Sequence, residues 1–407
     1  MAGQGWMKLL YITEDRFPPF RADVVELFGV CMPAMGHQIS WLMQRGSKAG
    51  SGALSEVWHG SKVYLIPRIG LKGLIGRIMN LFLALLGEWA VIPLAIQGKY
   101  DAIQVRDKFF TCIPAWIAAR LTGAQFFFWM SYPFAESRIY LATNGLTTKR
   151  VSFFVKGWLS FFLLYFFILR VADHVFVQSD QMLEDVRCHG IPRGKMTVVP
   201  MGIKKDQVLT EAAAREPDQL NPKFLYLGTL VRIRRLDLLV RMLKIVHQYY
   251  PGASLFFVGD GENPEDRVLL EEEVRRCGLE GHVTFTGFLP MEEAWRHVEQ
   301  ADICFSPFFP IPMLLSTSPT KLIEYMAKAK NVVANEHPEQ RRVLAESGVG
   351  RCVPWSETAF AEEVRRLLDH PEEAKSMAAK GPDYVRSFRT YDVIAAQLDK
   401  TYRRLLS

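Results

Sequence analysis

The sequence predicts an α/β protein made of two doubly wound parallel sheets, and three observations support this. Short apolar runs alternate with helical patterns along the whole chain, which is typical of successive βα units. The 407 residues are enough for two large domains at about 150 residues or more each. Apolar residues make up 49% of the chain and charged residues 23%, so there are enough apolar side chains to fill two cores. This composition excludes a disordered chain, a collagen-like fibre and a coiled coil.

In the first half, the expected strands are short apolar runs bounded by polar or turn residues. In chain order they are Lys8–Ile12, His37–Met43, Val63–Pro67, Ala102–Arg106, Gln125–Met130, His174–Gln178 and Met196–Val199. Helical patterns lie between them, for example over Ala22–Met35 and Phe110–Thr122. Strands separated by helices predict a parallel sheet covered by helices.

The second half repeats this alternation. Its expected strands are Lys223–Leu227, Ser254–Val258, Val283–Thr286, Ile303–Phe305, Val332–Ala334 and Gly350–Val353. Its expected helices are Leu236–Tyr249, Glu265–Cys277, Met291–Gln300, Pro319–Ala329 and Ala359–Leu368. The second half therefore predicts a second sheet of the same kind.

A polar segment without a strand pattern separates the two halves. We expect a first domain over residues 1–205, a linker over 206–222 and a second domain over 223–385. The remaining residues, 386–407, contain an amphipathic helical pattern over Tyr391–Leu406. Because this helix follows a complete second sheet, we expect it to cross back onto the first domain.

The charge of the chain is unevenly distributed. Its net charge is +6, but residues 1–205 contain 23 basic and 13 acidic residues, whereas the rest of the chain is net acidic. Seven of the nine tryptophans also lie in the first half. This combination favours an anionic or amphipathic partner, such as a membrane surface or nucleic acid. The cations are spread singly among apolar residues rather than clustered, so we expect no nucleic-acid partner.

Two stretches of the first half are unusually apolar. Gly157–Leu169 would form a helix of about 20 Å, which is shorter than the roughly 30 Å needed to span a bilayer. Leu74–Ile96 is interrupted by charged and polar residues. A buried helix and membrane contact are equally open for both stretches. The cations near Gly157–Leu169 favour an in-plane, monotopic contact with acidic lipid; they are Lys149, Arg150, Lys156 and Arg170.

Cysteine usage and the amino terminus point to a reducing compartment. The six cysteines are scattered and form no CxxC pair, which argues against a disulfide scaffold or a zinc ribbon. The first 15 residues lack the basic and apolar regions of a signal peptide. We therefore expect a cytoplasmic protein that is peripheral at the inner face of the cell membrane.

The first motif with chemical content is Tyr226–Asp237, where an expected strand ends in Gly228 and a basic loop follows. Glycine permits close approach of a ligand to the backbone. Guanidinium groups such as that of Arg234 bind diphosphates through paired hydrogen bonds. On this motif alone, a diphosphate clamp and a solvated basic loop are equally favoured.

Three further motifs stand at strand or helix ends. Phe257–Gly261 is a strand followed by a tight turn, and Thr284–Pro290 ends another strand with backbone groups that could pair with a base. Ser316–Ala327 places Pro319 at a helix start, where free N–H groups favour an anion. Each motif is weak alone, but four such loops along one sheet favour a bound sugar nucleotide.

These motifs, in this order, resemble the second domain of retaining GT-B glycosyltransferases of family 4, the glycosyl transferases group 1. The motifs are Gly-Thr-Leu…Arg, Val-Gly-Asp-Gly, Phe-Thr-Gly-Phe-Leu, Ala-Asp-Ile-Cys-Phe-Ser-Pro and Ser-Pro-Thr-Lys-Leu-Ile-Glu-Tyr-Met-Ala. The likeness covers roughly Lys223 to Leu406. It continues more weakly in the first half, at Leu10–Asp15, His174–Ser179 and Val198–Ile203.

The resemblance implies two Rossmann-like domains facing a cleft, with a nucleotide sugar on the second domain and an acceptor on the first. It implies catalytic roles for Arg234, which would steady the diphosphate, and for Glu324, which would hold the ribose hydroxyls. It further implies that no metal and no other cofactor is required. The implied nucleotide-sugar contacts are Gly228, Thr229, Arg232, Gly259, Gly287, Phe288, Leu289, Ser318, Pro319, Thr320, Lys321 and Leu322.

The sequence departs from the family pattern at several positions. The glutamate expected eight positions before Glu324 is Ser316, and Thr229 replaces a second phosphate-binding arginine. In the first half, Phe17–Arg21 replaces a Gly-Gly loop, and Ser131 stands where a histidine is common. These changes indicate a divergent subgroup or a member without turnover.

We therefore expect a retaining hexosyl- or related transferase that moves a sugar from a nucleotide donor to a lipid-linked or polysaccharide acceptor in cell-envelope or exopolysaccharide biosynthesis. The alternatives are a non-catalytic GT-B scaffold, which Ser316 supports, and a sugar-nucleotide epimerase. Acceptor contacts are expected at strand ends of the first domain, although each candidate could also be a solvated loop residue. These candidates are Glu14, Asp15, Arg21, Arg106 and Asp107.

Overall fold

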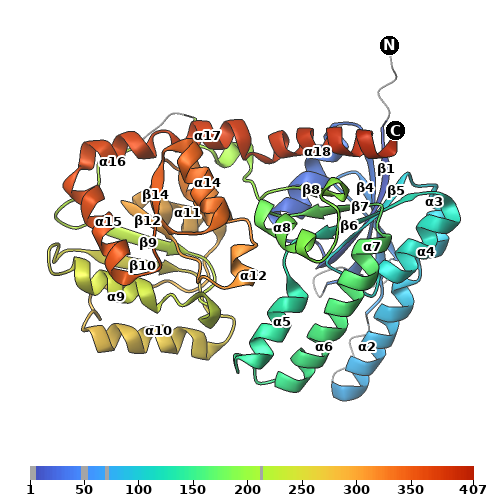
Figure 1. Ribbon diagram of the computed structural model, residues 1–407, viewed down its shortest axis with the longest axis horizontal. Coiled ribbons are helices and arrows are strands. Elements are labelled where there is room, and N and C mark those ends of the chain that lie inside the picture. The colour runs from blue at the N-terminus through green and yellow to red at the C-terminus, as the bar shows by residue number, and fades with distance from the viewer. Residues whose placement is uncertain (1–5, 47–53, 69–72, 211–213) are drawn as a thin grey trace, which may run out of the picture. The chain divides into compact units, whose positions relative to one another are not determined.

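The computed structural model of the protein describes residues 6–46, 54–68, 73–210 and 214–407 (Figure 1). The chain divides into two compact units. Unit 1 comprises Met1–Pro200 and Tyr391–Ser407, and unit 2 comprises Met201–Thr390. Each unit has a largely parallel sheet with helices on both faces, which confirms the predicted α/β class.

The sheet of unit 1 has eight strands in the order β3-β4-β2-β1-β5-β6-β7-β8, and every neighbouring pair is parallel except β3 and β4. The sequence did not predict edge strand β3, because its four residues include no apolar run. The strands are β1 (Lys8–Phe17), β2 (Gln38–Arg45), β3 (Ser55–Trp58), β4 (Ser61–Ile66), β5 (Ala102–Arg106), β6 (Gln125–Met130), β7 (His174–Val177) and β8 (Met196–Val198).

Helical segments cover both faces of this sheet. Alternate side chains of β1 point to opposite faces, so Leu10 and Ile12 enter one core while Leu9 and Tyr11 enter another. The segments are η1 (Val24–Cys31), α1 (Met32–Ala34), α2 (Gly73–Glu88), α3 (Val91–Gly98), α4 (Cys112–Thr122), α5 (Phe134–Thr143), α6 (Arg150–Phe162), η2 (Leu163–Ile168), α7 (Leu169–Val171), α8 (Asp180–Cys188) and η3 (Arg193–Lys195).

The last helix, α18 (Tyr391–Leu406), returns to unit 1, as the sequence predicted. Tyr402 is fully buried there and its hydroxyl bonds to the Gln104 side chain. Asp399 pairs with His37 at 2.8 Å. The helix therefore completes one core of unit 1 through apolar contacts and two long-range polar contacts.

The sheet of unit 2 has six parallel strands in the order β11-β10-β9-β12-β13-β14. Its strands are β9 (Lys223–Leu227), β10 (Ser254–Val258), β11 (Val283–Phe285), β12 (Ile303–Ser306), β13 (Asn331–Asn335) and β14 (Gly350–Val353). Its helical segments are η4 (Lys205–Gln207), η5 (Arg232–Arg234), α9 (Asp237–Val246), α10 (Pro264–Cys277), α11 (Met291–Gln300), α12 (Pro312–Leu315), α13 (Thr320–Ala327), α14 (Pro338–Ser347), α15 (Glu357–Asp369), α16 (Pro371–Ala378) and α17 (Gly381–Phe388).

The segment predicted as a linker, residues 206–222, lies within unit 2 in the structure. The backbone N–H of Leu209 donates to Ala327, and the Leu209 carbonyl accepts from Arg386. Arg215 pairs with Asp302 at 3.1 Å. These contacts attach a polar segment to the domain that follows it, so the chain passes between units at Pro200 and Met201.

Candidate functional site

Two glycines at the ends of neighbouring strands shape the candidate site in unit 2. Gly228 follows β9 with φ +137°, and Gly259 follows β10 with φ +133°. Other residues rarely adopt these backbone conformations. A Cβ on Gly259 would lie 2.2 Å from the Gly228 carbonyl oxygen, and a Cβ on Gly228 would lie 2.5 Å from Lys321 Cε. Both positions therefore require glycine, and the backbone is left open above the strand ends.

A cavity of about 330 Å³ lies at these strand ends. Eight of the residues predicted to contact a nucleotide sugar, counting Glu324, line it: Gly228, Thr229, Gly259, Phe288, Leu289, Thr320, Lys321 and Glu324. Phe288 is 67% exposed, which leaves a flat aromatic face at the cavity available to a ligand. The structure thus brings together residues from three strand ends and from the start of α13.

Four lining residues were not predicted from the sequence: Leu227, Val258, Met291 and Ala294. Leu227 and Val258 are the last residues of β9 and β10, and an apolar strand end gives no signal of ligand contact. Met291 begins α11 directly after the predicted turn at Gly287–Leu289, and this adjacency was the available signal. The four residues extend the apolar part of the lining, of which Phe288 and Leu289 were predicted.

The cations of the site are held by an aromatic residue. Arg234 donates from Nη1 to the Tyr226 hydroxyl at 3.1 Å, and Lys321 Nζ lies 5.5 Å from the centroid of the same ring. Among the described residues, no carboxylate lies within ion-pair distance of either cation. Two positive charges thus stand together beside an open cavity, an arrangement that favours an anionic ligand.

Burial and charge act together on the ionisable groups of α13. Burial lowers the pKa of Lys321 well below its usual value, and the nearby Arg234 lowers it further, while Glu324 opposes both. Burial also raises the pKa of Glu324, which Lys321 opposes. An anion bound here would remove part of the repulsion between Lys321 and Arg234.

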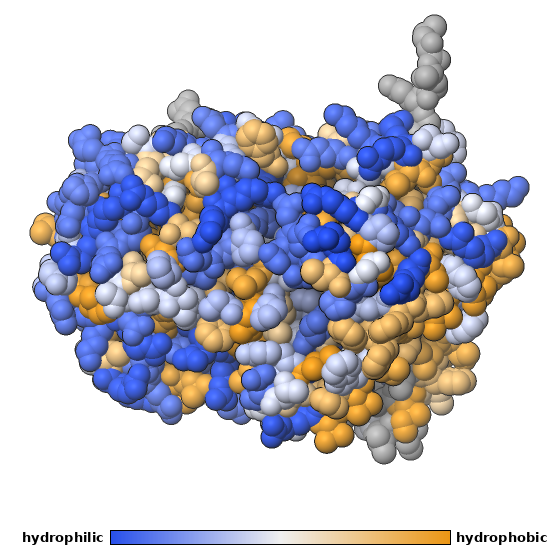
Figure 2. Space-filling model, viewed as in Figure 1, coloured by the Kyte–Doolittle hydropathy of each residue, from blue (hydrophilic) through white to orange (hydrophobic). Residues whose placement is uncertain are grey.

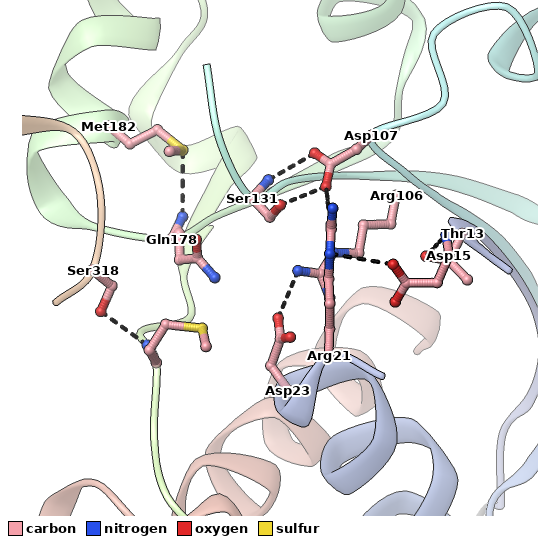
Figure 3. Close-up of polar contacts among 11 residues, drawn as sticks. Thr13, Asp15, Arg21, Asp23, Arg106, Asp107, Ser131, Gln178, Met182 and Ser318 are labelled. Atoms are coloured by element: carbon pink, nitrogen blue, oxygen red, sulfur yellow. Dashed lines mark hydrogen bonds and ion pairs between the residues drawn. The ribbon is translucent and has the colours of Figure 1, made fainter. Parts of the chain in front are cut away.

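Six other residues predicted to contact the donor lie outside the cavity lining: Arg232, Arg234, Gly287, Ser318, Pro319 and Leu322. Leu322 is buried in the core of unit 2. The Ser318 hydroxyl accepts from the Met201 N–H at 2.9 Å (Figure 3). It also donates to Glu339 at 3.0 Å. Contact with a donor stays a prediction for these six residues and for the eight that line the cavity, and the Ser318 side chain also supports the local backbone structure.

Ser316, the position where the family pattern has a glutamate, is buried. Its hydroxyl donates to the Pro312 carbonyl at 3.1 Å, one turn earlier at the start of α12. The side chain therefore supports the backbone before the donor helix and presents no carboxylate. Any contact with a transferred sugar must come from other groups.

A second polar cluster lies at strand ends of unit 1 (Figure 3). Arg106, at the end of β5, pairs with Asp23 at 2.8 Å and with Asp107 at 3.4 Å, and all three side chains are nearly inaccessible. Asp107 also accepts from Ser131, from N at 2.9 Å and from Oγ at 2.5 Å. Although burial alone would lower the pKa of Arg106, the carboxylates raise it. The guanidinium is thus held as a cation inside the unit.

The cluster reaches the surface through Arg21. Its guanidinium pairs with Asp15 at 3.2 Å and with Asp107 at 3.4 Å, and 28% of its side chain is exposed. Glu14 lies at the surface beside this cluster. Four of the five predicted acceptor-side residues are therefore joined in one network, and Arg21 and Glu14 are the accessible ones. Asp23 was missed because it stands in no recognisable motif, and Ser131 was noted only as the replacement of a common histidine.

Two helical stretches give unit 1 an exposed apolar surface, which we call the apolar face. The described chain contains two helices long and apolar enough to cross a membrane by length and composition, Ile78–Gly98 and Arg150–Val171. Only 18% and 28% of their most apolar segments are buried, so neither is an ordinary core helix. The second is 22 residues long, which exceeds the predicted segment Gly157–Leu169. Figure 2 shows hydrophobic residues gathered over α2 and α6.

The exposed side chains of Arg150–Val171 follow one side of the helix. They recur three or four residues apart, as expected for a single stripe: Val151, Phe154, Val155, Trp158, Leu159, Phe162 and Phe166. The opposite side, with Leu164 and Ile168, enters the core of unit 1. The helix is therefore partly buried and also exposes an apolar stripe, and its contact with a membrane stays a prediction.

Two protein families match the chain, and together they cover most of it. Residues 221–370 match the glycosyl transferases group 1, and residues 22–202 match the glycosyl transferase 4-like domain. The first match contains the cavity of unit 2, and the second contains the apolar face and the cluster residues Asp23, Arg106, Asp107 and Ser131, while Asp15 and Arg21 precede it.

Curated relatives are mycobacterial mannosyltransferases. A GDP-mannose-dependent alpha-(1-6)-phosphatidylinositol monomannoside mannosyltransferase of Mycobacterium tuberculosis is 26% identical over 216 residues, 51% of this chain and 55% of that protein. A phosphatidyl-myo-inositol mannosyltransferase of Mycobacterium leprae is 26% identical over 208 residues, 50% of this chain and 52% of that protein. The chain thus matches about half the length of these relatives.

Solved structures share the fold over nearly the whole chain. Sucrose-phosphate synthase from Thermosynechococcus elongatus superposes with a TM-score of 0.74 at 18% identity, covering 98% of this chain and 99% of that one. Anabaena HepE in complex with UDP superposes with a TM-score of 0.71 at 14% identity, covering 98% of this chain and 100% of that one. With the two family matches, this shows that the chain belongs to the group 1 glycosyltransferases and has the GT-B fold of family 4-like members.

Proposed function

We propose that the protein transfers a sugar from a nucleotide-sugar donor bound by unit 2. The observation that carries this proposal is the pairing of Arg234 and Lys321 beside the glycine-lined cavity. A departing nucleoside diphosphate gains negative charge as its bond to the sugar breaks, and preorganised cations stabilise that charge. Glu324, which lines the same cavity, supplies a carboxylate for ribose hydroxyls.

We propose further that transfer needs no metal ion and retains the configuration of the anomeric carbon. The two cations of unit 2 would neutralise the diphosphate, which is the task of a divalent ion in metal-dependent transferases. Retention is what the family resemblance implies. Turnover in the presence of EDTA tests the first proposal, and the anomeric configuration of the first product, read by NMR, tests the second.

The acceptor is proposed to be lipid-linked or a glycan, as in cell-envelope or exopolysaccharide biosynthesis. The relatives in Mycobacterium are named for transfer to phosphatidylinositol-based lipids, which supports a lipid acceptor. Arg21 and Glu14, at the surface of unit 1, are the proposed contacts for the polar part of such an acceptor. A cluster rich in carboxylates suits the hydroxyl groups of a sugar or cyclitol.

The apolar face is proposed to bind the membrane surface at the cytoplasmic side of the cell membrane. Exposed aromatic and aliphatic side chains would enter the lipid interface, and exposed cations on and beside the same helix would contact acidic head groups. These cations are Lys149, Arg150, Lys156 and Arg170. The helix Arg150–Val171 contains no acidic residue, so its charges all favour an anionic surface.

Binding to a panel of nucleotide sugars tests the donor proposal. Isothermal titration calorimetry with GDP-, UDP- and ADP-linked hexoses should show one nucleotide preferred, and transfer to lipid extracts should follow that preference. Arg234→Ala and Glu324→Ala should lose binding. If the wild-type protein binds no donor, the proposed transfer activity is wrong, and a non-catalytic scaffold describes the protein better.

Sedimentation with vesicles tests the membrane proposal. The protein should sediment with vesicles that contain acidic lipid, and much less of it should sediment with neutral vesicles. Phe162 and Phe166 are 53% and 61% exposed, so changing both to serine should abolish sedimentation without unfolding unit 1. Phe388→Ser, at a site 56% exposed in unit 2, is the matched control. Equal binding by the folded double variant would contradict the proposal.

A further inference from the structure

Tyr226 is a fully buried tyrosine at the start of the motif Tyr226–Asp237, and the sequence assigned its side chain no role. It lies on β9 two residues before Gly228, and its ring belongs to the core of unit 2 beside Phe257. A tyrosine in such a place serves the core through its ring, and its hydroxyl requires a partner. Here the partners of the hydroxyl belong to the candidate donor site.

The hydroxyl of Tyr226 has two hydrogen-bond partners, and together they fix its orientation. It accepts from Arg234 Nη1 at 3.1 Å and donates to the Thr229 carbonyl at 3.2 Å. Burial raises the pKa of Tyr226, although Arg234 opposes this, so the group acts as a neutral dipole. Because its proton is committed to a backbone carbonyl, its lone pairs face the guanidinium.

The second cation is held over the same residue. Lys321 Nζ lies 5.5 Å from the Tyr226 ring centroid, within the range of a cation–π contact. The place that a Cβ of Gly228 would occupy is 3.1 Å from Lys321 Nζ and 3.7 Å from the Tyr226 hydroxyl oxygen. The ammonium and the phenol thus both lie beside Gly228, which lines the cavity.

These contacts explain how two cationic side chains keep their positions beside each other. Arg234 and Lys321 repel each other, and among the described residues neither forms an ion pair with a carboxylate. A long side chain without a fixed partner populates several rotamers and so does not keep one position. Tyr226 provides the shared contact, one cation at its oxygen and the other at its ring.

We infer that Tyr226 is a positioning residue that sets Arg234 and Lys321 for the diphosphate of the donor. The inference rests on the proposed donor site and extends it to a residue that does not line the cavity. It requires that Tyr226 act only on the phosphate end of a ligand. A nucleoside without phosphates should therefore bind independently of the Tyr226 hydroxyl.

Calorimetry with nucleoside diphosphates and with the matching nucleosides tests this inference. Tyr226→Phe keeps the ring and removes the hydroxyl. We expect diphosphate affinity to fall about tenfold to a hundredfold, the range for a lost hydrogen bond to a charged group, with nucleoside affinity unchanged. Loss of both affinities together, or of neither, would overturn the inference.

Tyr325→Phe is the matched control for this measurement. Tyr325 is also fully buried, and its hydroxyl accepts from the Leu227 N–H at 2.8 Å, on the residue next to Tyr226. It contacts the same strand, so it reports the cost of losing a buried hydroxyl there. Its diphosphate-to-nucleoside ratio should match the wild type. If the wild-type protein binds no diphosphate at all, the donor site itself is wrong, which is a different failure.

Discussion

The two units use charge in opposite ways. In unit 1, Arg106 and Arg21 are neutralised by carboxylates inside the polar cluster, and the outer surface is apolar and basic. In unit 2, Arg234 and Lys321 lack such partners among the described residues and stand beside an open cavity. The cations of unit 1 are thus paired with carboxylates, whereas those of unit 2 are in contact with an aromatic residue, Tyr226.

This contrast shows that net charge is a poor guide to where an anion binds. Residues 1–205 carry the excess of basic side chains, yet their buried arginines are already paired. The rest of the chain is net acidic and still contains the cationic cavity. An anion responds to the charges left unpaired at one place, not to the sum over a domain.

The largest effect should come from removing a cation of unit 2. Arg234→Ala or Lys321→Ala should reduce kcat/KM for transfer about 100- to 1000-fold, since each removes charge from the leaving diphosphate. Arg235→Ala is the matched control, because that guanidinium already pairs with Asp237 at 3.1 Å. Steady-state kinetics with the preferred donor measure this. Equal losses in all three variants would show that the whole basic loop, and not two chosen cations, binds the donor.

A smaller but clear effect is expected from the glycine beneath Lys321. Gly228→Ala places a methyl group 2.5 Å from Lys321 Cε at φ +137°, so the lysine must move and the backbone is strained. Donor affinity should fall about tenfold, and the free energy of unfolding should fall by about 1–3 kcal/mol. Gly281→Ala, where a Cβ would meet nothing within 4 Å, is the control. Calorimetry and urea unfolding separate the two losses, and unchanged affinity would mean that Lys321 does not bind the donor.

Much of the fold could be predicted because local patterns determine it. The bounds of β5, β6, β9, β10, β14, α11 and α18 agree with the sequence expectations. Short apolar runs between turns and amphipathic spacing suffice for such elements. The π-helical segment Val24–Cys31 was expected as ordinary helix, because its apolar pattern does not distinguish the two.

The candidate site was only partly predictable, for a physical reason. Glycines and cations after a strand indicate a ligand, and eight of the donor contacts that the family resemblance implies line the cavity. Tyr226 lies inside an apolar strand and reads as a core residue, so only the three-dimensional contact with Arg234 reveals its second task. Ser318 shows the reverse, since its motif suggested a ligand and its hydroxyl binds Met201 and Glu339. Local sequence does not determine the direction in which a side chain points.

The dependence of donor binding on pH would sharpen the contrast between the units. Burial and Arg234 lower the pKa of Lys321 in the free protein, and a bound diphosphate should raise it. Above the lowered pKa, binding must take up a proton, so affinity should fall as pH rises, by up to about tenfold per pH unit. Calorimetry in buffers of different ionisation enthalpy measures the uptake directly. Lys321→Met should remove the slope, and a slope that survives in this variant would assign the proton elsewhere.

The smallest effect concerns stability in acid, where the two units should behave alike. Burial lowers the pKa of His174 in unit 1 and of His337 in unit 2 to about 4. In the unfolded chain a histidine titrates near pH 6.5, so below that pH the unfolded state binds more protons. The stability from each neutral histidine is therefore present above about pH 6.5 and is lost as pH falls towards 4. His337→Gln can keep the donor to the Leu314 carbonyl and should make Tm of unit 2 less sensitive to pH between 7.5 and 5. Thermal unfolding at both pH values measures this, and an unchanged pH sensitivity would mean that acid acts on unit 2 through its carboxylates.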